Sequence, residues 1–395
     1  MMKNKWQYRK IGDVCVVERG SSPRPIDQFI TEDGGGINWI KIGDTTESMY
    51  ITETAQKIKP EGMKKSRYVE PGDFLLSNSM SFGRPYILKI DGCIHDGWLV
   101  LKDKDEIFDK RFLYYYLSSK ATYQKFKHMA VGGVVNNLNS EMVRKIDVPV
   151  PSKDEQMDTA DLLDKICNII SLRKRELNCL DDLIRARFVE LFGDMFLNTM
   201  SWNEEPLEEM ANVVSGITKG RKLKAQCTTE VPYMAVSNVK DGYIDWTTVK
   251  TIEATEQEIN QYRLLPEDVL MTEGGDPDKL GRGAIIKEPL ENCIHQNHIF
   301  RVRLNATVIL PEFFAEYLRH QKSKRYFLGC AKQTTGIASI NMRQLKALPV
   351  LLPPLELQNQ FADFVKVVDK SKAAVQKALD QTQLLFDSLM QEYFG

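Results

Sequence analysis

The stretch GCIHDGWLVL, residues 92–101, returns 200 positions later as NCIHQNHIFRV, residues 292–302. Three further stretches also occur twice: PGDFLLS (71–77) with PEDVLMT (266–272), FLYYYLSSKATYQKF (112–126) with FFAEYLRHQKSKRYF (313–327), and VELFG (189–193) with QEYFG (391–395). The pairs keep one order, and their offsets drift only from 195 to 202 residues. Chance matches would not stay collinear, and a repeat of this length is a whole module rather than a solenoid unit. The chain is therefore predicted to contain one two-part module twice.

The first part of each module, residues 1–152 and 202–352, contains short runs of β-type residues separated by Gly, Pro, Asn and Asp. This pattern predicts strands joined by turns. A helix rich in aromatic residues is expected after the strands, at Lys110–Ala130 and at Pro311–Leu328. Both parts are therefore predicted to be globular α+β domains. The expected strands are Ile37–Ile42, Asp73–Leu76, Tyr86–Ile90, Gly97–Leu101, Tyr233–Val236, Asp268–Met271, Ala284–Lys287 and His298–Leu304.

The second part of each module, residues 153–193 and 353–395, repeats apolar residues every seven positions. Four to five heptads predict a long helix with one apolar stripe. We expect the two helices to form an antiparallel coiled coil with pseudo-two-fold symmetry, and residues 194–201 to be a linker. The alternative is that each helix folds onto its own globular domain. The stripe contains Leu163, Ile170, Leu177, Ile184 and Leu191, interleaved with Ile166, Arg173, Leu180 and Arg187, and then Phe361, Val368, Val375, Thr382 and Leu389, interleaved with Phe364, Ser371, Ala378 and Leu385.

Composition excludes several classes of protein. The 395 residues are 43% hydrophobic and 27% charged, which is typical of a globular chain and not of a disordered or collagen-like one. No apolar run reaches the length of a membrane helix, and the first residues lack the apolar core of a signal peptide, so a cytoplasmic location is expected. Seven scattered cysteines without a C-x-x-C pair indicate reduced thiols. The formal net charge of -1 means that any basic surface for nucleic acid must be local.

Catalytic and metal motifs are missing or explained more simply. The sequence has no P-loop, no nucleophile elbow and no amino-methyltransferase signature. The run Asp276-Pro-Asp-Lys279 is interpreted as a polar turn rather than a nuclease site, since the first module has no equivalent. Cys293, His295 and His298 have a zinc-like spacing, but in a strand His298 would point away from the other two. We therefore interpret the histidines as packed or hydrogen-bonded core residues, and expect no metal.

Basic and amide-rich loops lie at matching places in the two modules, while the strands that frame them match in sequence. Arg, Lys, Asn and Ser are the side chains that reach phosphates and base edges. A constant scaffold beneath varying loops predicts two binding domains with different targets. The candidate DNA-binding residues are Arg19, Ser21, Ser22, Arg24, Ser77, Asn78, Ser79, Arg84, Asn136 and Asn137 in the first module, and Lys219, Arg221, Lys222, Lys224, Lys279, Arg282, Lys332, Thr334 and Thr335 in the second.

Over essentially its whole length the chain resembles the specificity subunit of type I restriction-modification systems. The resemblance rests on motifs that occur in the same order in both modules and precede a long helix each time. Such motifs include NWIKIGD (38–44), VPYMAVSNV (231–239), PEDVLMT (266–272) with GRGA (281–284), and LPVLLPPLELQ (348–358). The first module departs at residues 149–156, PVPSKDEQ, where the double proline is absent.

The resemblance implies a non-catalytic subunit with two target-recognition domains, each of which reads one half of a split DNA sequence. The paired helices would then act as a spacer and dock two modification subunits, with two restriction subunits completing the complex. It implies that S-adenosylmethionine, ATP and Mg are bound by those partners and not by this chain, and that no membrane is involved. The expected subunit-interface residues are Leu163, Ile170, Arg173, Leu177, Ile184, Arg187, Phe361, Val368, Val375 and Leu389. The rival hypotheses are an interaction scaffold that does not bind DNA and a DNA-modifying enzyme with an unfamiliar catalytic module.

Overall fold

The duplicated Cys-Ile-His stretch forms the same pair of strands in both halves of the chain. In the first half, β10 (Gly92–Ile94) and β11 (Trp98–Asp103) flank a turn at residues 95–97. In the second half, β20 (Ile294–His295) and β21 (Ile299–Leu304) flank a turn at residues 296–298. β10 pairs in parallel with β4 (Ile37–Ile40), and β20 pairs in parallel with β15 (Thr228–Met234). The equal pairing confirms that the two halves are copies of one module.

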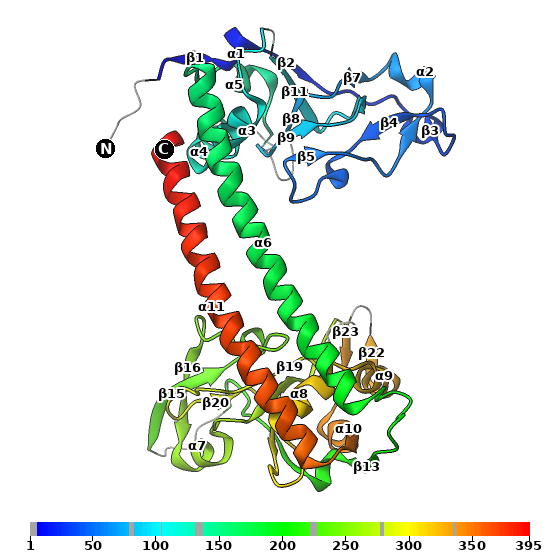
Figure 1. Ribbon diagram of the computed structural model, residues 1–395, viewed down its shortest axis with the longest axis vertical. Coiled ribbons are helices and arrows are strands. Elements are labelled where there is room, and N and C mark those ends of the chain that lie inside the picture. The colour runs from blue at the N-terminus through cyan, green and yellow to red at the C-terminus, as the bar shows by residue number, and fades with distance from the viewer. Residues whose placement is uncertain are drawn as a thin grey trace. The chain divides into compact units, whose positions relative to one another are not determined.

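The computed structural model describes residues 6–78, 83–103, 105–130, 137–221, 227–276, 280–334 and 337–395, without the side chains of 333, 334 and 337. The chain divides into two units (Figure 1). Unit 1 contains Met1–Lys174 and Lys377–Gly395, and unit 2 contains Arg175–Gln376. Each unit therefore holds one globular domain together with parts of both long helices, α6 (Lys153–Phe192) and α11 (Leu355–Phe394).

The described part of unit 1 contains two five-stranded sheets, with the strand orders β2-β11-β8-β9-β5 and β3-β6-β4-β10-β7, and a separate antiparallel pair, β1–β12. Three short helices, α3, α4 and α5, follow the strands. The remaining elements of the domain are β1 (Tyr8–Lys10), α1 (Ile11–Val14), β2 (Cys15–Arg19), β3 (Ile30–Thr31), β5 (Tyr50–Ile51), β6 (Lys57–Ile58), α2 (Pro60–Met63), β7 (Arg67–Val69), β8 (Phe74–Ser77), β9 (Pro85–Leu88), α3 (Lys110–Ser118), α4 (Lys120–Ala130), α5 (Ser140–Arg144) and β12 (Asp147–Pro149).

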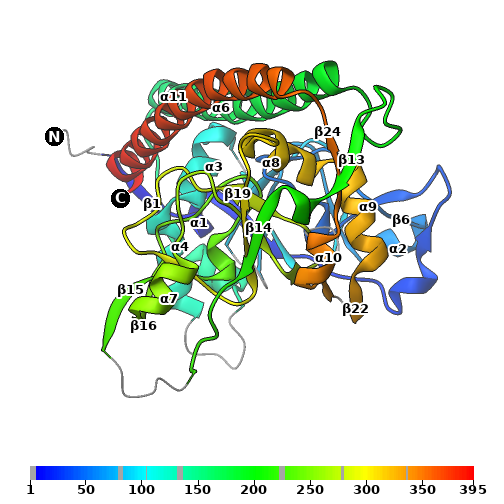
Figure 2. The ribbon, with the colours of Figure 1, turned by 90° about the horizontal axis from the view of Figure 1, so that it is seen from below.

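Unit 2 follows the same plan in its described residues, with the sheets β14-β21-β17-β19 and β16-β15-β20 and the pair β13–β24. It adds a small sheet, β18-β23-β22. Figure 2 shows β15, β16 and α7 on one side of this domain, and α9, α10 and β22 on another. The elements are β13 (Asn203–Pro206), β14 (Ala211–Ser215), β16 (Lys250–Thr255), α7 (Glu256–Tyr262), β17 (Val269–Thr272), β18 (Gly274–Gly275), β19 (Gly283–Ile285), α8 (Pro311–Arg319), α9 (Gln321–Cys330), β22 (Lys332–Thr334), β23 (Ile337–Ser339), α10 (Met342–Lys346) and β24 (Pro349–Leu352).

The central strands of each domain are buried on both faces. In β11, Leu99 and Leu101 join the core beneath the helices, whereas Trp98 and Val100 join the core between the sheets. In β21, Phe300 and Val302 lie on the helix side and Ile299 on the other. Successive side chains of a strand point to opposite faces, so a strand buried on both faces needs an uninterrupted apolar run. The WLVL run supplies it in β11. In β21 the buried Arg301 interrupts the apolar run, and its guanidinium donates to Asn212 Oδ1 at 2.8 Å.

The helix predicted at Lys110–Ala130 is two helices, and so is the one predicted at Pro311–Leu328. α3 ends before Ser119 and α8 ends before His320, and both of these residues have extended backbone. Ser119 Oγ accepts from Thr122 N–H, and His320 Nδ1 accepts from Lys322 N–H. Each residue therefore acts as an N-cap for the next helix, a role that local side-chain acceptors can fill. The near-helical spacing of the aromatic residues does not reveal this break.

The two long helices pack antiparallel, as predicted. In unit 2, the Phe188 ring lies 5.3 Å from the Phe361 ring, and Lys372 Nζ lies 2.5 Å from Asp181 Oδ1, so position rises on α6 as it falls on α11. In unit 1, Leu163 near the beginning of α6 shares a core with Phe394 at the end of α11. The same stripe also packs on the globular domains, because Phe188 and Phe361 share a core with Phe313. No helix in the described residues is long and apolar enough to cross a membrane.

Half of the expected subunit-interface residues are buried within this chain. Leu163, Ile170, Ile184, Phe361 and Val368 are buried inside this chain, so they cannot contact another subunit without the chain opening. The companion stripe residues Leu177, Val375 and Leu389 are half-buried. The seam therefore holds the chain's own helices together, and a partner would need a different face of them.

Two arginines, Arg173 and Arg187, stand in the otherwise largely apolar seam. Arg173 donates to the Ala378 carbonyl and the Thr382 hydroxyl of α11. Arg187 pairs with Glu190 of its own helix at 2.9 Å and lies over the Phe364 ring. Seam arginines are thus accommodated by polar atoms and an aromatic face rather than by acids across the seam.

His295 gives unit 2 a built-in sensitivity to acid. Its side chain is fully buried, with Nδ1 3.1 Å from the Tyr262 carbonyl and Nε2 3.4 Å from the Val214 carbonyl. Burial lowers the pKa of His295 from 6.5 to about 4. Below pH 6.5 His295 is protonated in the unfolded chain, whereas in the folded unit it becomes protonated only near pH 4. Stability from this residue is therefore complete above pH 6.5 and is lost as the pH falls.

We expect the free energy of unfolding of unit 2 to drop by about 2–3 kcal/mol more in the native chain than in His295→Gln between pH 7 and pH 4.5. The measurement is urea unfolding followed by hydrogen exchange of unit 2 peptides. His128→Gln, at an exposed position, is the matched control and should keep the native pH dependence. Equal pH dependence in His295→Gln and the native chain would contradict the assignment.

Candidate nucleic-acid interface

The candidate loops of unit 1 meet at the turn between β10 and β11. The Asp96 carbonyl accepts hydrogen bonds from Arg19 Nε at 3.1 Å and from Asn78 Nδ2 at 2.8 Å. The Asp96 carboxylate accepts from Ser22 Oγ at 2.9 Å and lies 3.7 Å from the Arg24 guanidinium. Two segments more than 50 residues apart in the sequence are thus fastened to one turn residue.

The chain that follows the third candidate loop of unit 1 lies beside the second. The Leu138 N–H donates to the Asn78 carbonyl at 3.0 Å. Asn137 is the exposed residue just before this contact. Among the described residues, parts of the first two loops and the chain next to the third therefore lie together.

A glycine lets the first loop of each module press against the duplicated histidine. A Cβ atom on Gly20 would lie 2.1 Å from the His95 carbonyl oxygen, and one on Gly216 would lie 1.9 Å from the His295 carbonyl oxygen. Real Cβ atoms do not approach oxygen this closely, so only glycine fits without moving the backbone. The same device thus seats the first loop in both units.

Charge at the unit 1 turn is locally balanced. Burial acts to raise the pKa of the Asp96 carboxyl, but the hydrogen bond from Ser22, the backbone and the nearby His95 and Arg19 outweigh it and lower that pKa. Burial lowers the pKa of His95 beside it, whose Nδ1 accepts from the Gly97 N–H at 2.9 Å. Asp96 is therefore a fixed anion that aligns the surrounding donors.

The structure separates supporting residues from exposed ones. Ser77 and Asn78 are buried, with Ser77 Oγ accepting from the Arg84 N–H at 3.0 Å. These two predicted contacts therefore hold the loops in place rather than face a ligand. Arg19, Ser21 and Arg84 are exposed, and 82% of the Arg24 side chain is exposed. Ser22 and Arg24 border a hollow of about 930 Å³ that is also lined by Trp39, Lys41 and His95.

In unit 2 the equivalent turn gathers the equivalent segments. Ser215 Oγ donates to the Asn297 carbonyl at 2.5 Å, and the Ile217 N–H donates to the His295 carbonyl at 2.9 Å. Glu273, at the beginning of the second loop, is also attached to this turn, because its Oε2 lies 2.5 Å from His298 Nδ1. The Ile340 N–H, just after β23, donates to the Glu273 carbonyl at 2.9 Å and brings the β22–β23 hairpin alongside.

The candidate residues of unit 2 have unequal roles. Arg221 donates to both carboxylate oxygens of Glu258, at 2.5 and 2.6 Å, and this hydrogen bonding lowers the pKa of Glu258 to about 2. Since Glu258 belongs to the N-terminal capping box of α7, Arg221 stabilises that helix. Lys219 and Lys332 are exposed, and Arg282 is half-buried. Ser79, Asn136, Lys222, Lys224, Lys279 and Thr335 lie outside the described residues, as does the side chain of Thr334.

Sequence reasoning missed Asp96, Glu273 and His298, although the duplicated Cys-Ile-His stretch marked their neighbourhood. The interpretation of His295 as a satisfied core histidine is confirmed by its carbonyl partners, while His298 is exposed and paired with an acid. Throughout the described ranges, no group of three or more His, Cys, Asp or Glu side chains could hold a metal ion. The signal that points to Asp96 and His298 is their place in the turn after each buried Ile-His, whereas Glu273 follows β17 and carries no such signal.

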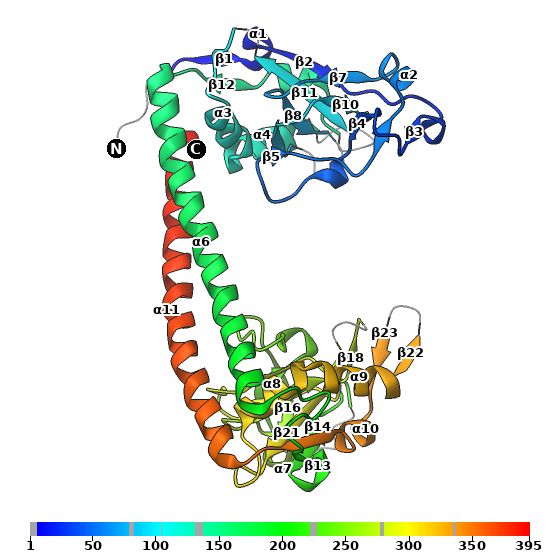
Figure 3. The ribbon, with the colours of Figure 1, turned by 45° about the vertical axis from the view of Figure 1, so that its right-hand side comes forward.

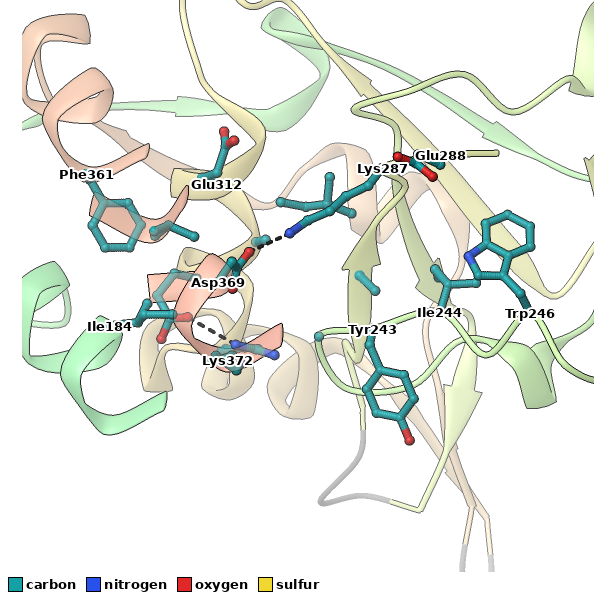
Figure 4. A pocket seen from close by; sticks show the side chains of 17 residues that line it. Ile184, Tyr243, Ile244, Trp246, Lys287, Glu288, Glu312, Phe361, Asp369 and Lys372 are labelled. Carbon is teal, nitrogen blue, oxygen red and sulfur yellow. Dashed lines mark hydrogen bonds and ion pairs between the residues drawn. The ribbon is translucent and has the colours of Figure 1, made fainter. Parts of the chain in front are cut away.

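Unit 2 contains a hollow of about 540 Å³ between its globular domain and the helices (Figure 4). Its cations are all paired with acids: Lys287 Nζ lies 2.5 Å from Asp369 Oδ2, Lys372 pairs with Asp181, and Arg319 pairs with Asp241 and Glu316. With its cations paired internally, this hollow joins helix to domain and is distinct from the loop cluster.

Comparison with known proteins agrees with the duplicated geometry. The pattern of the type I restriction modification DNA specificity domain matches residues 3–181 and 200–382. The chain belongs to this family. The family resemblance found from the sequence is thereby confirmed, and specificity subunits are the non-catalytic recognition subunits of their systems. The scaffold hypothesis is not favoured.

Individual members of the specificity family are distant relatives in sequence. The chain is 22% identical over 374 residues to the EcoKI specificity subunit of Escherichia coli, covering 89% of this chain and 78% of the relative. It is 23% identical over 405 residues to the MjaVIII specificity subunit of Methanocaldococcus jannaschii, covering 94% and 90%. The crystal structure of a type I restriction-modification system S subunit from M. genitalium has a TM-score of 0.56 at 16% identity and covers 100% of this chain and 98% of that one. A structure from work on assembly of a type I system gives a TM-score of 0.60 at 15% identity, with coverage of 100% and 98%.

The glycine contacts can be tested without any ligand. Gly20→Ala and Gly216→Ala should each lower the free energy of unfolding by about 1–3 kcal/mol, because the added methyl overpacks against a carbonyl. The measurement is chemical unfolding, with faster hydrogen exchange expected in residues 17–22 or 214–218. Gly34→Ala and Gly329→Ala, where an added Cβ meets nothing within 4 Å, are the matched controls. A neutral effect of both test substitutions would refute the close approach.

Proposed function

We propose that this chain is the DNA sequence-recognition subunit of a type I restriction-modification complex, and that each globular domain recognises one half of a bipartite target. In this proposal, residues 1–152 and 202–352 are the two target-recognition domains. Residues 153–193 and 353–395 are the spacer helices, and residues 194–201 link the two modules. Family membership supports the general role.

One observation carries the division into half-sites. Both domains fasten their loops to the turn after Ile-His through a glycine against the histidine carbonyl, yet the exposed side chains around that turn differ. Unit 1 presents Arg19, Arg24 and Arg84, whereas unit 2 presents Lys219 and the His298–Glu273 pair. Side chains of these kinds make hydrogen bonds to base edges and phosphates. Two domains with the same turn and glycine contact but different exposed side chains are therefore suited to two different half-sites.

The spacer role fits the length of the helices. α6 and α11 have 40 residues each, and at 1.5 Å per residue each measures about 60 Å. This exceeds the roughly 34–36 Å that separates half-sites one helical turn apart on DNA. A continuous helix is stiff, so the gap between half-sites would have a fixed length.

The proposed partners are double-stranded DNA, two modification subunits and two restriction subunits, inside a prokaryotic cell. S-adenosylmethionine, ATP and Mg would be bound by those subunits.

The apolar face for docking the modification subunits is on the outside of the helices. The exposed apolar residues are Leu162, Ile169, Leu172 and Leu183 on α6, and Val367, Leu384 and Leu385 on α11. Apolar side chains left exposed along a helix favour a protein partner.

Base-resolution mapping of N6-methyladenine, with and without this gene, tests the recognition role. We expect one split motif with a constant gap to lose methylation when the gene is deleted. Arg24→Gln should relax one half of the motif and Lys219→Gln the other, because each lost contact removes about 1–3 kcal/mol of discrimination. A variant in one unit that changes both half-sites, or a motif that survives deletion, would argue against the proposal.

The docking face has its own test. Ile169→Glu combined with Leu172→Glu should reduce recovery of the modification subunits with this chain at least about tenfold, since two carboxylates would be buried against apolar surface. The measurement is co-purification followed by sedimentation velocity. Leu290→Glu, at an exposed leucine of the second globular domain, is the matched control. Normal assembly of the double variant would place the modification subunits elsewhere.

A further inference from the structure

Helix α4 of unit 1 has an outward face without acidic residues. Its sequence, KATYQKFKHMA, contains no Asp or Glu, and Thr122, Phe126 and Ala130 are the side chains turned into the domain. The opposite face presents Lys120, Gln124 and Lys127, flanked by Tyr123 and His128, and all five are exposed. Since Lys120 and Lys127 are seven residues apart, they stand about 10 Å apart along the helix axis.

The charge on this face is largely uncompensated. Lys120 Nζ lies 3.4 Å from Asp387 Oδ2, but 85% of the Lys120 side chain is exposed, so water and salt screen the pair. Lys127 has no acidic partner among the residues that the structure describes. A lysine that is not used for folding is available to a ligand.

The face adjoins a candidate recognition loop. A Cβ on Gly83 would lie 3.1 Å from the Phe126 ring, so residues 83–84 sit directly against α4. A hollow of about 1140 Å³ there is lined by Arg84, Lys120, Tyr123 and Lys174, with Glu47 as its one acid among the described residues. The hollow of Figure 4 in unit 2 differs, because its lysines and arginine are all paired.

The copy of α4 in unit 2 keeps the character of the face while its residues differ. α9, QKSKRYFLGC, also lacks Asp and Glu, and it exposes Lys324 and Arg325 at the positions of Tyr123 and Gln124. Lys324 has no ion pair within the described ranges, and Arg325 lies over the Phe196 ring at 4.4 Å. A surface that stays basic through changes of individual residues favours a partner recognised by charge.

We propose that the acid-free faces of α4 and α9 bind the phosphate backbone of DNA without regard to base sequence. This inference rests on the proposed function, and it adds the surface that supplies affinity to the loops that supply specificity. Phosphates are contacted mainly by exposed Lys and Arg, and these contacts position a protein without reading sequence. A protein partner is less suited, because the core of a protein interface is apolar and depleted in charge, whereas the α4 face has Tyr123 as its one large exposed apolar side chain in the described residues.

The test uses the full chain assembled with its modification subunits. Binding is measured to a 30-bp duplex of random sequence and to a duplex that contains the methylated motif, over a series of salt concentrations. In Lys120→Gln with Lys127→Gln, the slope of log K against log salt should be shallower by about 1.8, and the affinity at 0.1 M salt lower by about 10- to 100-fold on both duplexes. Lys120→Arg with Lys127→Arg keeps the charge and should bind as the native complex does.

Lys59→Gln with Lys64→Gln is the control for loss of charge in the same domain. These two exposed lysines flank the beginning and end of α2, and Figure 3 shows α2 at the opposite end of the domain from α4. The control should leave slope and affinity unchanged. Lys324→Gln should make the slope of log K against log salt shallower by about 0.9, as the loss of one phosphate contact predicts.

Three outcomes would overturn the inference. An unchanged slope of log K against log salt in the Lys120 and Lys127 double variant would show that this face does not contact phosphates. A loss confined to the motif duplex would make the face a reader of bases, and a loss of modification subunits from the complex would make it a protein interface. Failure of the native complex to bind either duplex would overturn the proposed function itself, and the native measurement separates that result from the other three.

Discussion

The two-sided burial of β11 and β21 is the constraint on which the rest of each domain depends. A strand that is covered on both faces cannot slide or twist without exposing apolar side chains, so the turn at its beginning is held at one position. In unit 1 that turn carries Asp96, and in unit 2 it carries Gln296, Asn297 and His298. The loops are fastened to this rigid point either directly or through a neighbouring segment, as Leu138 is through Asn78, and this allows their exposed side chains to differ.

The fastening uses mainly backbone and small side chains, together with Arg19, whose Nε donates to the Asp96 carbonyl. Gly20 and Gly216 pack against carbonyls, and Asn78 and Ser22 donate hydrogen bonds to Asp96. The exposed Arg24, Arg84 and Lys219 take little part in this support. Such a division means that a change of exposed side chains alters what is bound with little effect on folding, which suits a subunit whose role is to specify a sequence.

Charged side chains are also divided between support of the fold and surfaces left open to a partner. The chain as a whole is near neutral, with 53 basic and 54 acidic residues, so non-specific attraction to DNA cannot come from net charge. Acids are instead paired with cations where the fold needs rigidity, as in Arg111 with Asp161 and Asp164 or Arg303 with Asp268. The faces of α4 and α9 lack acids and so leave their cations available to an anionic partner.

The sequence alone determined the duplication, the α+β class of each domain and the two long helices, because periodic burial and repeated motifs are local patterns that persist along the chain. It also singled out the segments that contain Ser22 and Asn78, whose side chains meet at Asp96. Only the tertiary structure decided which of their residues face outward, since Ser77, Asn78 and Arg221 have the same chemistry as exposed ligands but are spent on internal hydrogen bonds. The structure likewise showed that Asp96 and Glu273 join the site. These facts depend on contacts between residues far apart in sequence, which no local pattern encodes.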